Sequence, residues 1–219
     1  MLDELLLYDD LEAKPAALNM AVDEALLEST ATPALRFYRW LSPALSFGYF
    51  GSYADVSDRQ SEREIVRRWT GGGIVLHGND LTYSMIIPTA HPFLARSSLE
   101  IYSALHDAIR RALEANGIEA TLAPSAPPKI SENCFANPVQ ADVISGGQKI
   151  AGAAHRRSRA GLLHQGSVQR ANLPGRFKED FARIVCDRFE RQTFSPAVIE
   201  RAGAIAVTKY GTPEWLLRR

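Results

Sequence analysis

The sequence predicts an α+β domain in which a mixed or antiparallel β-sheet is flanked by helices. Two features of the chain predict this class. Short segments of strand composition outnumber the helical segments, and most of the strand-like segments are neighbours along the chain. Neighbouring strands usually pair directly, and the few helices then cover the faces of the sheet. A chain of 219 residues buries a sizeable core without disulfides, so we expect one domain over residues 1–219, with no accessory domain.

The strand-like segments are rich in branched and aromatic residues and are bounded by Gly, Pro, Ser or Asn. Gly146 and Gly147 separate two of them and indicate a β-hairpin. The expected strands are 35–40, 45–50, 65–69, 74–77, 81–87, 118–123, 141–144, 149–154 and 162–169.

The helical segments carry recognisable start and stop signals. The first covers residues 16–29. The second begins with a capping box formed by Ser97 and Glu100 and ends at Gly117, and we expect His106 on its exposed surface. The core of the domain then spans about residues 16–170, and the C-terminal helices span about 174–211. The first of these helices carries apolar residues from Phe177 to Phe189 on one side, and the second begins at Ser195-Pro196.

Composition excludes several classes of protein. Lys plus Arg and Asp plus Glu number 25 each, so the basic excess typical of nucleic-acid binding is absent. No stretch approaches the roughly 20 apolar residues of a membrane span, and residues 1–7 lack the pattern of a signal peptide. The five histidines show no metal-binding spacing, so no metal site is expected. These observations predict a soluble, cytoplasmic protein.

Three consecutive glycines, Gly71, Gly72 and Gly73, lie between two strand-like segments. Arg67 and Arg68 precede them in the sequence, with only a Trp-Thr pair in between. Glycines let a backbone approach a ligand closely. The loop is not a P-loop, because no Gly-Lys-Ser/Thr follows, and it lacks the spacing of a dinucleotide fingerprint. Two readings remain open from these residues alone: a loop that holds an anionic or polar group, and a flexible turn with exposed arginines.

Several segments together resemble one known family. Arg-Arg-x-Thr-Gly-Gly-Gly-x-Val-x-His at residues 67–77 is similar to the signature of the lipoate and octanoate branch of the biotin and lipoate protein ligase superfamily. Further segments agree with it in order along the chain: 18–26, 35–50, 147–154 and 162–167. The resemblance implies the fold of the superfamily's catalytic domain.

The resemblance also implies a set of site residues. Lys149, taken alone, is either a solvated strand-edge lysine or a donor to a carbonyl or phosphate oxygen, and the resemblance favours the second role. His77 and His164 are candidates for ligand contact or for accepting a proton from an amine. An apolar tunnel lined by Leu76 and Tyr83 would hold an acyl chain. The full set of expected substrate-binding residues is Arg68, Thr70, Gly71, Gly72, Gly73, Leu76, His77, Tyr83, Gly152 and His164.

Cys134 distinguishes two branches of the family. By itself, a cysteine in a turn-rich stretch is either a small buried hydrophobe or a thiolate nucleophile. Its Asn-Cys-Phe-x-x-Pro context resembles the cysteine-dependent acyltransferases of the family. Cys186, in contrast, lies in a helical segment and is expected only to pack.

The implied reaction is transfer of an octanoyl group from acyl carrier protein to a lysine of a lipoyl-domain protein, through a thioester on Cys134 and with no cofactor. The acceptor would be a protein such as the glycine cleavage H protein or the E2 subunit of a 2-oxoacid dehydrogenase. The first alternative is an ATP- and magnesium-dependent lipoate–protein ligase, in which Arg68 and the glycines hold an acyl-adenylate bridged by Lys149. The second alternative is a non-catalytic domain that binds lipoyl proteins or acyl chains.

Partners are also suggested by a cationic run at residues 155–159, His-Arg-Arg-Ser-Arg. It is either a solvated hairpin tip or a docking patch for an acidic partner, and acyl carrier proteins and lipoyl domains are typically acidic. Opposite charges of this kind accelerate association more than they tighten binding. We expect neither nucleic-acid nor membrane partners.

Overall fold

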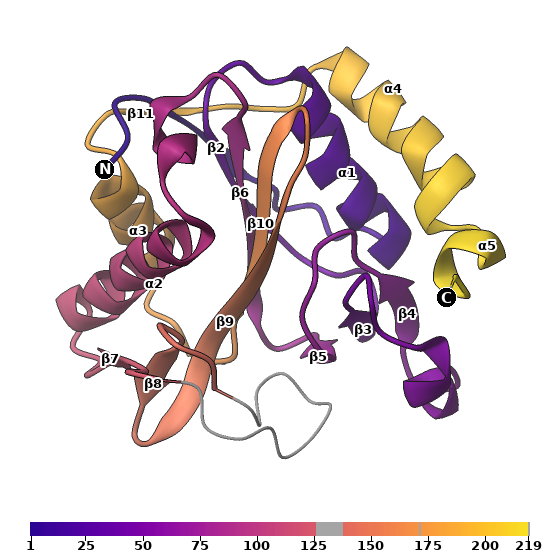
Figure 1. Cartoon of the computed structure of the whole chain (residues 1–219), viewed down its shortest axis with the longest axis horizontal. Helices are drawn as coiled ribbons and strands as arrows, with labels where there is room; N and C mark the ends of the chain where they lie inside the picture. The colour runs from indigo at the N-terminus through magenta and orange to yellow at the C-terminus, as the bar shows by residue number, and fades with distance from the viewer. Residues whose placement is uncertain (126–137, 171, 219) are drawn as a thin grey trace.

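A mixed β-sheet forms the centre of the protein. The structure is a computed structural model that describes residues 1–125, 138–170 and 172–218. Within these ranges an eight-stranded sheet has the order β11-β1-β2-β6-β10-β9-β8-β7, with helices on both faces (Figure 1). Its strands are β1 (Leu5–Asp9), β2 (Ala34–Tyr38), β6 (Leu81–Pro88), β7 (Thr121–Leu122), β8 (Val143–Ser145), β9 (Gln148–Arg157), β10 (Gly161–Val168) and β11 (Phe189–Arg191).

The pairing of the strands is mostly antiparallel. β1 pairs parallel with both β2 and β11, whereas β2, β6, β10, β9, β8 and β7 pair antiparallel in that order. A short second sheet consists of β4 (Glu64–Arg67), β3 (Ala44–Phe47) and β5 (Val75–His77), in the order β4-β3-β5. Because the glycine triplet connects β4 to β5, the small sheet fixes both ends of that loop.

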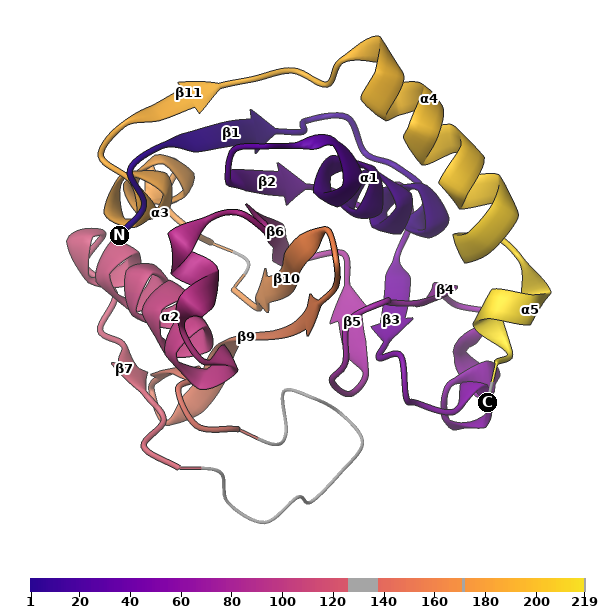
Figure 2. The same ribbon diagram turned by 45° about the horizontal axis from the view of Figure 1, so that its top comes forward.

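Helices cover the two faces of the large sheet separately. α2 (Ser98–Ala115) and α3 (Phe177–Val185) pack on one face, and α1 (Ala16–Ser29) and α4 (Pro196–Ile205) lie on the other (Figure 2). A last short helix, α5 (Pro213–Leu216), lies beside the small sheet. Each face therefore has its own apolar core, which keeps the sheet rigid beneath any site built on it.

Local sequence explains the start of α2. The Ser97 hydroxyl accepts a hydrogen bond from Glu100 N at 3.2 Å, and the Glu100 carboxylate accepts one from Ser97 N at 2.8 Å. This reciprocal pairing satisfies amide groups that a helix start otherwise leaves without partners. The predicted capping box is confirmed.

The predicted fold class is confirmed, and so is the helix over 16–29. Two elements differ from the predictions. β1 was not expected, and the helix predicted to reach Phe189 ends at Val185, since Cys186 adopts an extended conformation and Phe189 begins β11. Both differences arise from one cause: β1 and β11 pair with each other in parallel from distant parts of the chain, which short-range sequence patterns do not reveal. Cys186 is buried, as expected.

His106 was expected on the surface of the second helix, and this prediction is wrong. The side chain is fully buried, and its Nδ1 donates a hydrogen bond to the carbonyl oxygen of Ala141 at 2.7 Å. Its ring lies 4.0 Å from that of Tyr102. Burial lowers the pKa of His106 to about 4, although Asp142 opposes the shift.

The low pKa of His106 predicts a pH dependence of stability. Unfolding restores the ordinary pKa of about 6.5, so the unfolded chain binds more protons between about pH 6.5 and 4. Stability is therefore fully present above pH 6.5 and decreases as the pH falls towards 4, by up to ~1.4 kcal/mol per pH unit for this histidine. We expect His106→Asn to reduce that slope in urea unfolding between pH 6.5 and 4, and to leave the pH dependence above pH 7 as it is in the wild type. An unaltered slope in His106→Asn would contradict the assignment.

Candidate active site

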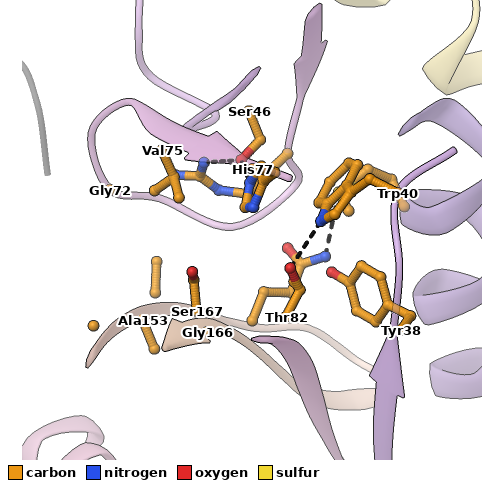
Figure 3. Close-up of a pocket in the computed structure, with 15 residues that line it drawn as sticks. Tyr38, Trp40, Ser46, Gly72, Val75, His77, Thr82, Ala153, Gly166 and Ser167 are labelled. Atoms are coloured by element: carbon orange, nitrogen blue, oxygen red, sulfur yellow. Dashed lines mark hydrogen bonds between the residues drawn. The ribbon is translucent and has the colours of Figure 1, made fainter. Parts of the chain in front are cut away.

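A narrow pocket lies between the glycine loop and the large sheet (Figure 3). Its floor follows one row of paired residues across four strands, from Gly152 on β9 through Ser167 and Thr82 to Tyr38 on β2. Because adjacent strands are about 4.8 Å apart, three steps give the floor a length of about 14 Å. The lining residues are Met20, Tyr38, Trp40, Ser46, Arg68, Gly72, Val75, His77, Thr82, Gly152, Ala153, Ala154, Gln165, Gly166 and Ser167.

The glycine loop forms the roof of this pocket. A Cβ atom on Gly48 would lie 2.0 Å from the carbonyl oxygen of Gly72, so the two backbones meet only because Gly48 has no side chain. Gly72 itself has a φ of +87°, which glycine adopts without strain. Arg68 donates to the carbonyl oxygens of Gly71 at 3.1 Å and Gly73 at 2.8 Å. The loop is thus held from both sides rather than being a flexible turn.

Arg68 also binds the small sheet. Its Nη1 donates to the Ser46 hydroxyl at 2.6 Å, and the residue is buried. The preceding Arg67 has a separate role: its guanidinium donates to carbonyl oxygens of Tyr49 and Gly51, and to those of Leu216 at the end of α5 and Arg218 after it. Thr70 donates to Gln165 Oε1 at 2.8 Å and ties the loop to the sheet.

Lys149 lies at one end of the pocket floor. Its side chain is almost fully buried, and its Nζ is 2.8 Å from Asp142 Oδ2. A Cβ atom on Gly152 would lie 2.4 Å from Lys149 Cε and 2.7 Å from Nζ. Since Gly152 lines the pocket, the missing side chain at this position gives the ammonium group its place beside the pocket floor.

The partner of Lys149 is itself held by several hydrogen bonds. Asp142 accepts a hydrogen bond from the Tyr102 hydroxyl at 2.5 Å and another from Val139 N at 2.6 Å. Ala141, just before it, has a φ of +68°, an unusual value for a residue with a side chain. Burial and the negative charge of Asp142 raise the pKa of Tyr102, which keeps the hydroxyl protonated as a donor. The carboxylate is therefore rigidly presented to Lys149.

The opposite end of the pocket is closed by two stacked rings. Trp40 and His77 lie 4.1 Å apart at an angle of 20° between their planes. His77 accepts a hydrogen bond from the Ser46 hydroxyl at its Nε2, 2.7 Å away, and donates from Nδ1 to Asp80 at 2.8 Å. Burial lowers the pKa of His77 despite the opposing effect of Asp80, which favours the neutral ring that this pattern requires.

The structure brings most of the predicted site residues together. Four of them line the pocket: Arg68, Gly72, His77 and Gly152. Thr70, Gly71 and Gly73 shape its roof, and Lys149 lies beside its floor.

Three predicted residues lie elsewhere. Leu76 alternates with the inward-facing Val75 and His77 on β5, so it faces outward and is partly exposed. Tyr83 and His164 lie in the core under α2 and α3, where the Tyr83 hydroxyl is 3.1 Å from His164 Nε2. Tyr83 directly follows Thr82 on β6. Because successive side chains of a strand point to opposite faces, Tyr83 lies on the other face of the sheet. The predicted tunnel lining is therefore replaced by Val75, Thr82 and Met20.

Cys134 lies outside the described residues. Of the cationic run at 155–159, Arg157 donates to the carbonyl oxygens of Leu94 and Arg96, and the Arg156 guanidinium lies 4.6 Å from the Tyr49 ring centroid. Two of the arginines in this run therefore make contacts with other parts of the protein.

Sequence reasoning missed several side chains that line the pocket. Ser167 and Gln165 on β10 point to the pocket from alternate positions, as does Thr82 on β6. The alternation of polar residues in these two strands was a usable signal once the strands were known to be neighbours. Asp142 carried no comparable signal, because its link to Lys149 depends on the tight turn between β8 and β9.

The residues that the structure describes contain neither a group of side chains suited to a metal ion nor a helix suited to crossing a membrane. No three His, Cys, Asp or Glu side chains there come together in a way that would hold a metal ion. None of the helices in the described ranges has both the length and the apolar character needed to cross a bilayer.

The central sheet with helices on both faces places the chain in a fold class, the one seen in solved structures of lipoate protein ligases. The chain belongs, within it, to the lipoyl protein ligase A/B catalytic domain family, whose model matches residues 15–210. The resemblance noted in the sequence is confirmed.

Individual relatives agree with this assignment. The chain is 41% identical over 162 residues to the octanoyltransferase LipM of Oceanobacillus iheyensis, covering 70% of this chain and 59% of that protein. It is 35% identical over 173 residues to LipM of Geobacillus kaustophilus, covering 70% and 61%. The chain thus spans about 60% of the length of these curated relatives.

Solved structures share the fold. A putative lipoate protein ligase from Thermoplasma acidophilum with bound lipoic acid has a TM-score of 0.78 at 21% identity, covering 99% of each chain. A lipoate-protein ligase A bound with ATP has the same TM-score at 20% identity, again covering 99% of each chain.

The Lys149–Asp142 pair predicts a specific pattern of stability changes. Removing one partner takes the opposite charge away from a buried ion, so Asp142→Asn and Lys149→Met should each cost about 3 kcal/mol or more. The double variant should cost less than the sum of the two, because neither charge remains. Urea unfolding of the four proteins measures this coupling, with the exposed pair Arg183 and Glu179 as a control expected to give about 0.5 kcal/mol or less. Additive costs at 142 and 149 would contradict the pairing.

Proposed function

We propose that this protein transfers an octanoyl group from acyl carrier protein to a lysine of a lipoyl-domain protein, by way of a thioester on Cys134. The observation that carries the proposal is the position of Lys149 at one end of a narrow, largely apolar pocket. The names of the LipM relatives, which are octanoyltransferases, support the reaction.

The pocket suits an acyl chain better than it suits a nucleotide. Met20, Val75, Ala153 and Ala154 contribute apolar walls, and the 14 Å floor is extended and narrow. Burying methylene groups contributes roughly 0.8 kcal/mol each, so an eight-carbon chain gains substantial affinity from such a slot.

In the first step the Cys134 thiolate attacks the carbonyl carbon of the donor thioester. A new carbon–sulfur bond to Cys134 forms, the bond to the donor sulfur breaks, and the donor thiol leaves with the proton that Cys134 gave up. The negative charge that develops on the carbonyl oxygen lies within the field of the Lys149 ammonium, which stabilises it.

In the second step the amine of the acceptor lysine attacks the Cys134 thioester. An amide bond forms, the carbon–sulfur bond breaks, and the amine proton returns to the Cys134 sulfur. Each step requires only one protein partner at the site, which is the benefit of a covalent intermediate.

No cofactor enters this reaction. The competing proposal is ATP-dependent lipoate ligation, which the ATP-bound structural neighbour and the intact Gly71–Gly73 roof favour. There the magnesium-bound nucleotide activates a free acid, and Lys149 would contact the carbonyl oxygen and the phosphate of the adenylate.

The acceptor partner is proposed to be a lipoyl domain. A bipartite lipoate protein ligase of Thermoplasma acidophilum, similar in fold, has been studied together with its E2 lipoyl domain. The donor is proposed to be acyl carrier protein, and the reaction to take place in the cytoplasm.

The test supplies an apo lipoyl domain with either octanoyl-carrier protein alone or free lipoate, ATP and magnesium. Octanoyl transfer from the first donor without ATP, and its loss in Cys134→Ser, are the expected results. Product only with free acid and ATP, unaffected by Cys134→Ser, would establish the ligase. Binding of the lipoyl domain without product from either donor would instead indicate a non-catalytic domain.

Gly152→Ala tests the role of Lys149 without removing it. The added methyl group would occupy the space of Cε and Nζ, so the ammonium must move from the pocket floor. We expect kcat for octanoyl transfer to fall by about 100-fold, corresponding to the loss of one donor to the oxyanion. Gly203→Ala on α4, where an added methyl group meets no atom within 4 Å, is the control and should change kcat by less than about threefold. Full activity in Gly152→Ala would exclude Lys149 from the reaction.

A further inference from the structure

Three basic and three aromatic side chains alternate in a closed circle beside the glycine loop. They come from distant segments: the loops after β3 and β4, strand β9, the π-helical turn Ala206–Tyr210, and α5 with the residues that follow it. α5 and the end of the described chain lie beside the small sheet, which brings these segments together (Figure 2). We call the six side chains the basic aromatic cluster: Tyr49, Arg156, Trp69, Lys209, Trp215 and Arg218.

Two arginines of the basic aromatic cluster share one tyrosine ring. The Arg156 guanidinium lies 4.6 Å from the ring centroid of Tyr49, and the Arg218 guanidinium lies 4.4 Å from it. Arg156 is also 4.9 Å from the ring centroid of Trp69, and Arg218 is 5.0 Å from that of Trp215. A cation over the face of an aromatic ring is attracted by the charge distribution of the ring, so these contacts hold both guanidinium groups in place.

Lys209 closes the circle between the two tryptophans. Its Nζ lies 4.4 Å from the ring centroid of Trp69 and 4.5 Å from that of Trp215. Lys209 also has a carboxylate partner, because its Nζ is 2.7 Å from Glu24 Oε2. The arginines differ in this respect: among the residues that the structure describes, no carboxylate lies within ion-pair distance of Arg156 or Arg218.

The two arginines therefore create a local excess of positive charge. Neighbouring Arg67 shows its effect, because burial lowers the pKa of Arg67 and the charge of Arg218 lowers it further. The whole chain has equal numbers of acidic and basic residues, so the excess belongs to this part of the surface. A fixed excess of one charge attracts and orients a partner of the opposite charge.

Apolar side chains are exposed next to these charges. The Phe50 ring lies 5.0 Å from that of Tyr49, and Phe50 is 88% exposed. Leu217 is 52% exposed and lines one groove together with Phe50 and Arg218. Exposed aromatic residues together with arginine and tryptophan are the composition of protein-binding surfaces, whereas an ordinary solvated surface is richer in lysine and acidic residues.

The basic aromatic cluster lies beside the roof of the pocket and at a distance from its reactive end. Gly152 and Ala154 line the pocket from alternate positions on β9, and Arg156 is the next residue on that face. Arg156 Nη1 donates to the carbonyl oxygen of Trp69 at 3.3 Å, just before the glycine loop. Four residues of strand from Gly152 to Arg156 correspond to about 13 Å, the distance that a partner docked here has to span to reach the Lys149 end.

We propose that the basic aromatic cluster is the docking surface for the acyl donor, an acidic carrier protein that presents its thioester on a long flexible arm. The inference rests on the proposed function and adds the surface that binds its donor. A lysine side chain has only four methylene groups between the backbone and the amine, so an acceptor protein docked at the cluster would not bring its amine to the pocket. The prosthetic arm of a carrier protein spans that distance.

The experiment compares two donors in the full chain: octanoyl-carrier protein, and octanoyl-pantetheine, a thioester with no protein attached. We expect Arg218→Glu to lower kcat/KM for the carrier protein by at least about tenfold and to leave kcat/KM for octanoyl-pantetheine unchanged, because charge at a docking surface acts on association of the protein. Arg156→Gln should give the same pattern, and Arg218→Lys should retain most of the wild-type value.

Arg159→Glu is the matched control. Arg159 belongs to the same cationic run as Arg156 but is exposed at the hairpin tip, three residues further from the pocket. The substitution changes the net charge as Arg218→Glu does, and it should change kcat/KM for both donors by less than about twofold. Equal losses with the two donors in Arg218→Glu and Arg156→Gln, no loss with either, or a loss in Arg159→Glu as large as that in Arg218→Glu would each overturn the proposal.

Calorimetric binding separates this inference from the proposed function and identifies the partner. In a Cys134→Ser background, Arg218→Glu should weaken binding of octanoyl-carrier protein by at least about tenfold and leave binding of the apo lipoyl domain unchanged. Carrier binding that depends on Arg218, without acyl transfer by the wild type, would refute the transferase and leave the docking surface established. Weakened binding of the lipoyl domain alone would assign the cluster to the acceptor and overturn the proposal, as would no carrier binding at all.

Discussion

A buried ammonium group beside the pocket floor is the constraint on which the rest of this site depends. Removing a lysine from water is costly unless an opposite charge and further hydrogen bonds compensate it. Asp142 supplies that compensation at 2.8 Å, and Tyr102 and the backbone around it hold the carboxylate still. The space for the lysine side chain exists because Gly152 has none. A pairing of this kind contributes little net stability, so its value lies in placing one positive charge at a defined point beside an apolar slot.

The slot follows directly from the sheet. Along each strand alternate residues point to the same face, and residues paired across neighbouring strands share a face. One row of paired positions therefore makes a straight floor from Gly152 to Tyr38. The roof comes from the small sheet, whose glycine loop approaches closely enough only because of Gly48 and is held down by Arg68. Charge at one end and an aromatic wall at the other give the pocket both a direction and a length. An extended acyl thioester fits that description, with its reactive group at the charged end.

The sequence alone predicted the fold class, the first helix and the capping box at Ser97, because each depends on local patterns. It placed Lys149 and Gly152 on one strand, whereas the contact between these two positions, three residues apart, depends on the irregular pairing of β9 with β8. It did not predict β1 and β11, whose pairing joins distant segments, or the burial of His106, which depends on a carbonyl group far along the chain. The expected lining by Tyr83 illustrates how a shift of one residue in a strand moves a side chain to the opposite face.

The most direct measurement is a crystal structure of the protein bound to a stable octanoyl thioether analogue of the donor. The account predicts that the carbonyl-equivalent oxygen lies within hydrogen-bond distance of Lys149 Nζ, roughly 3 Å. It also predicts that the chain follows the floor over Ser167 and Thr82 towards Trp40. An analogue bound with its tail outside this slot, or with its polar end remote from the lysine, would contradict the account.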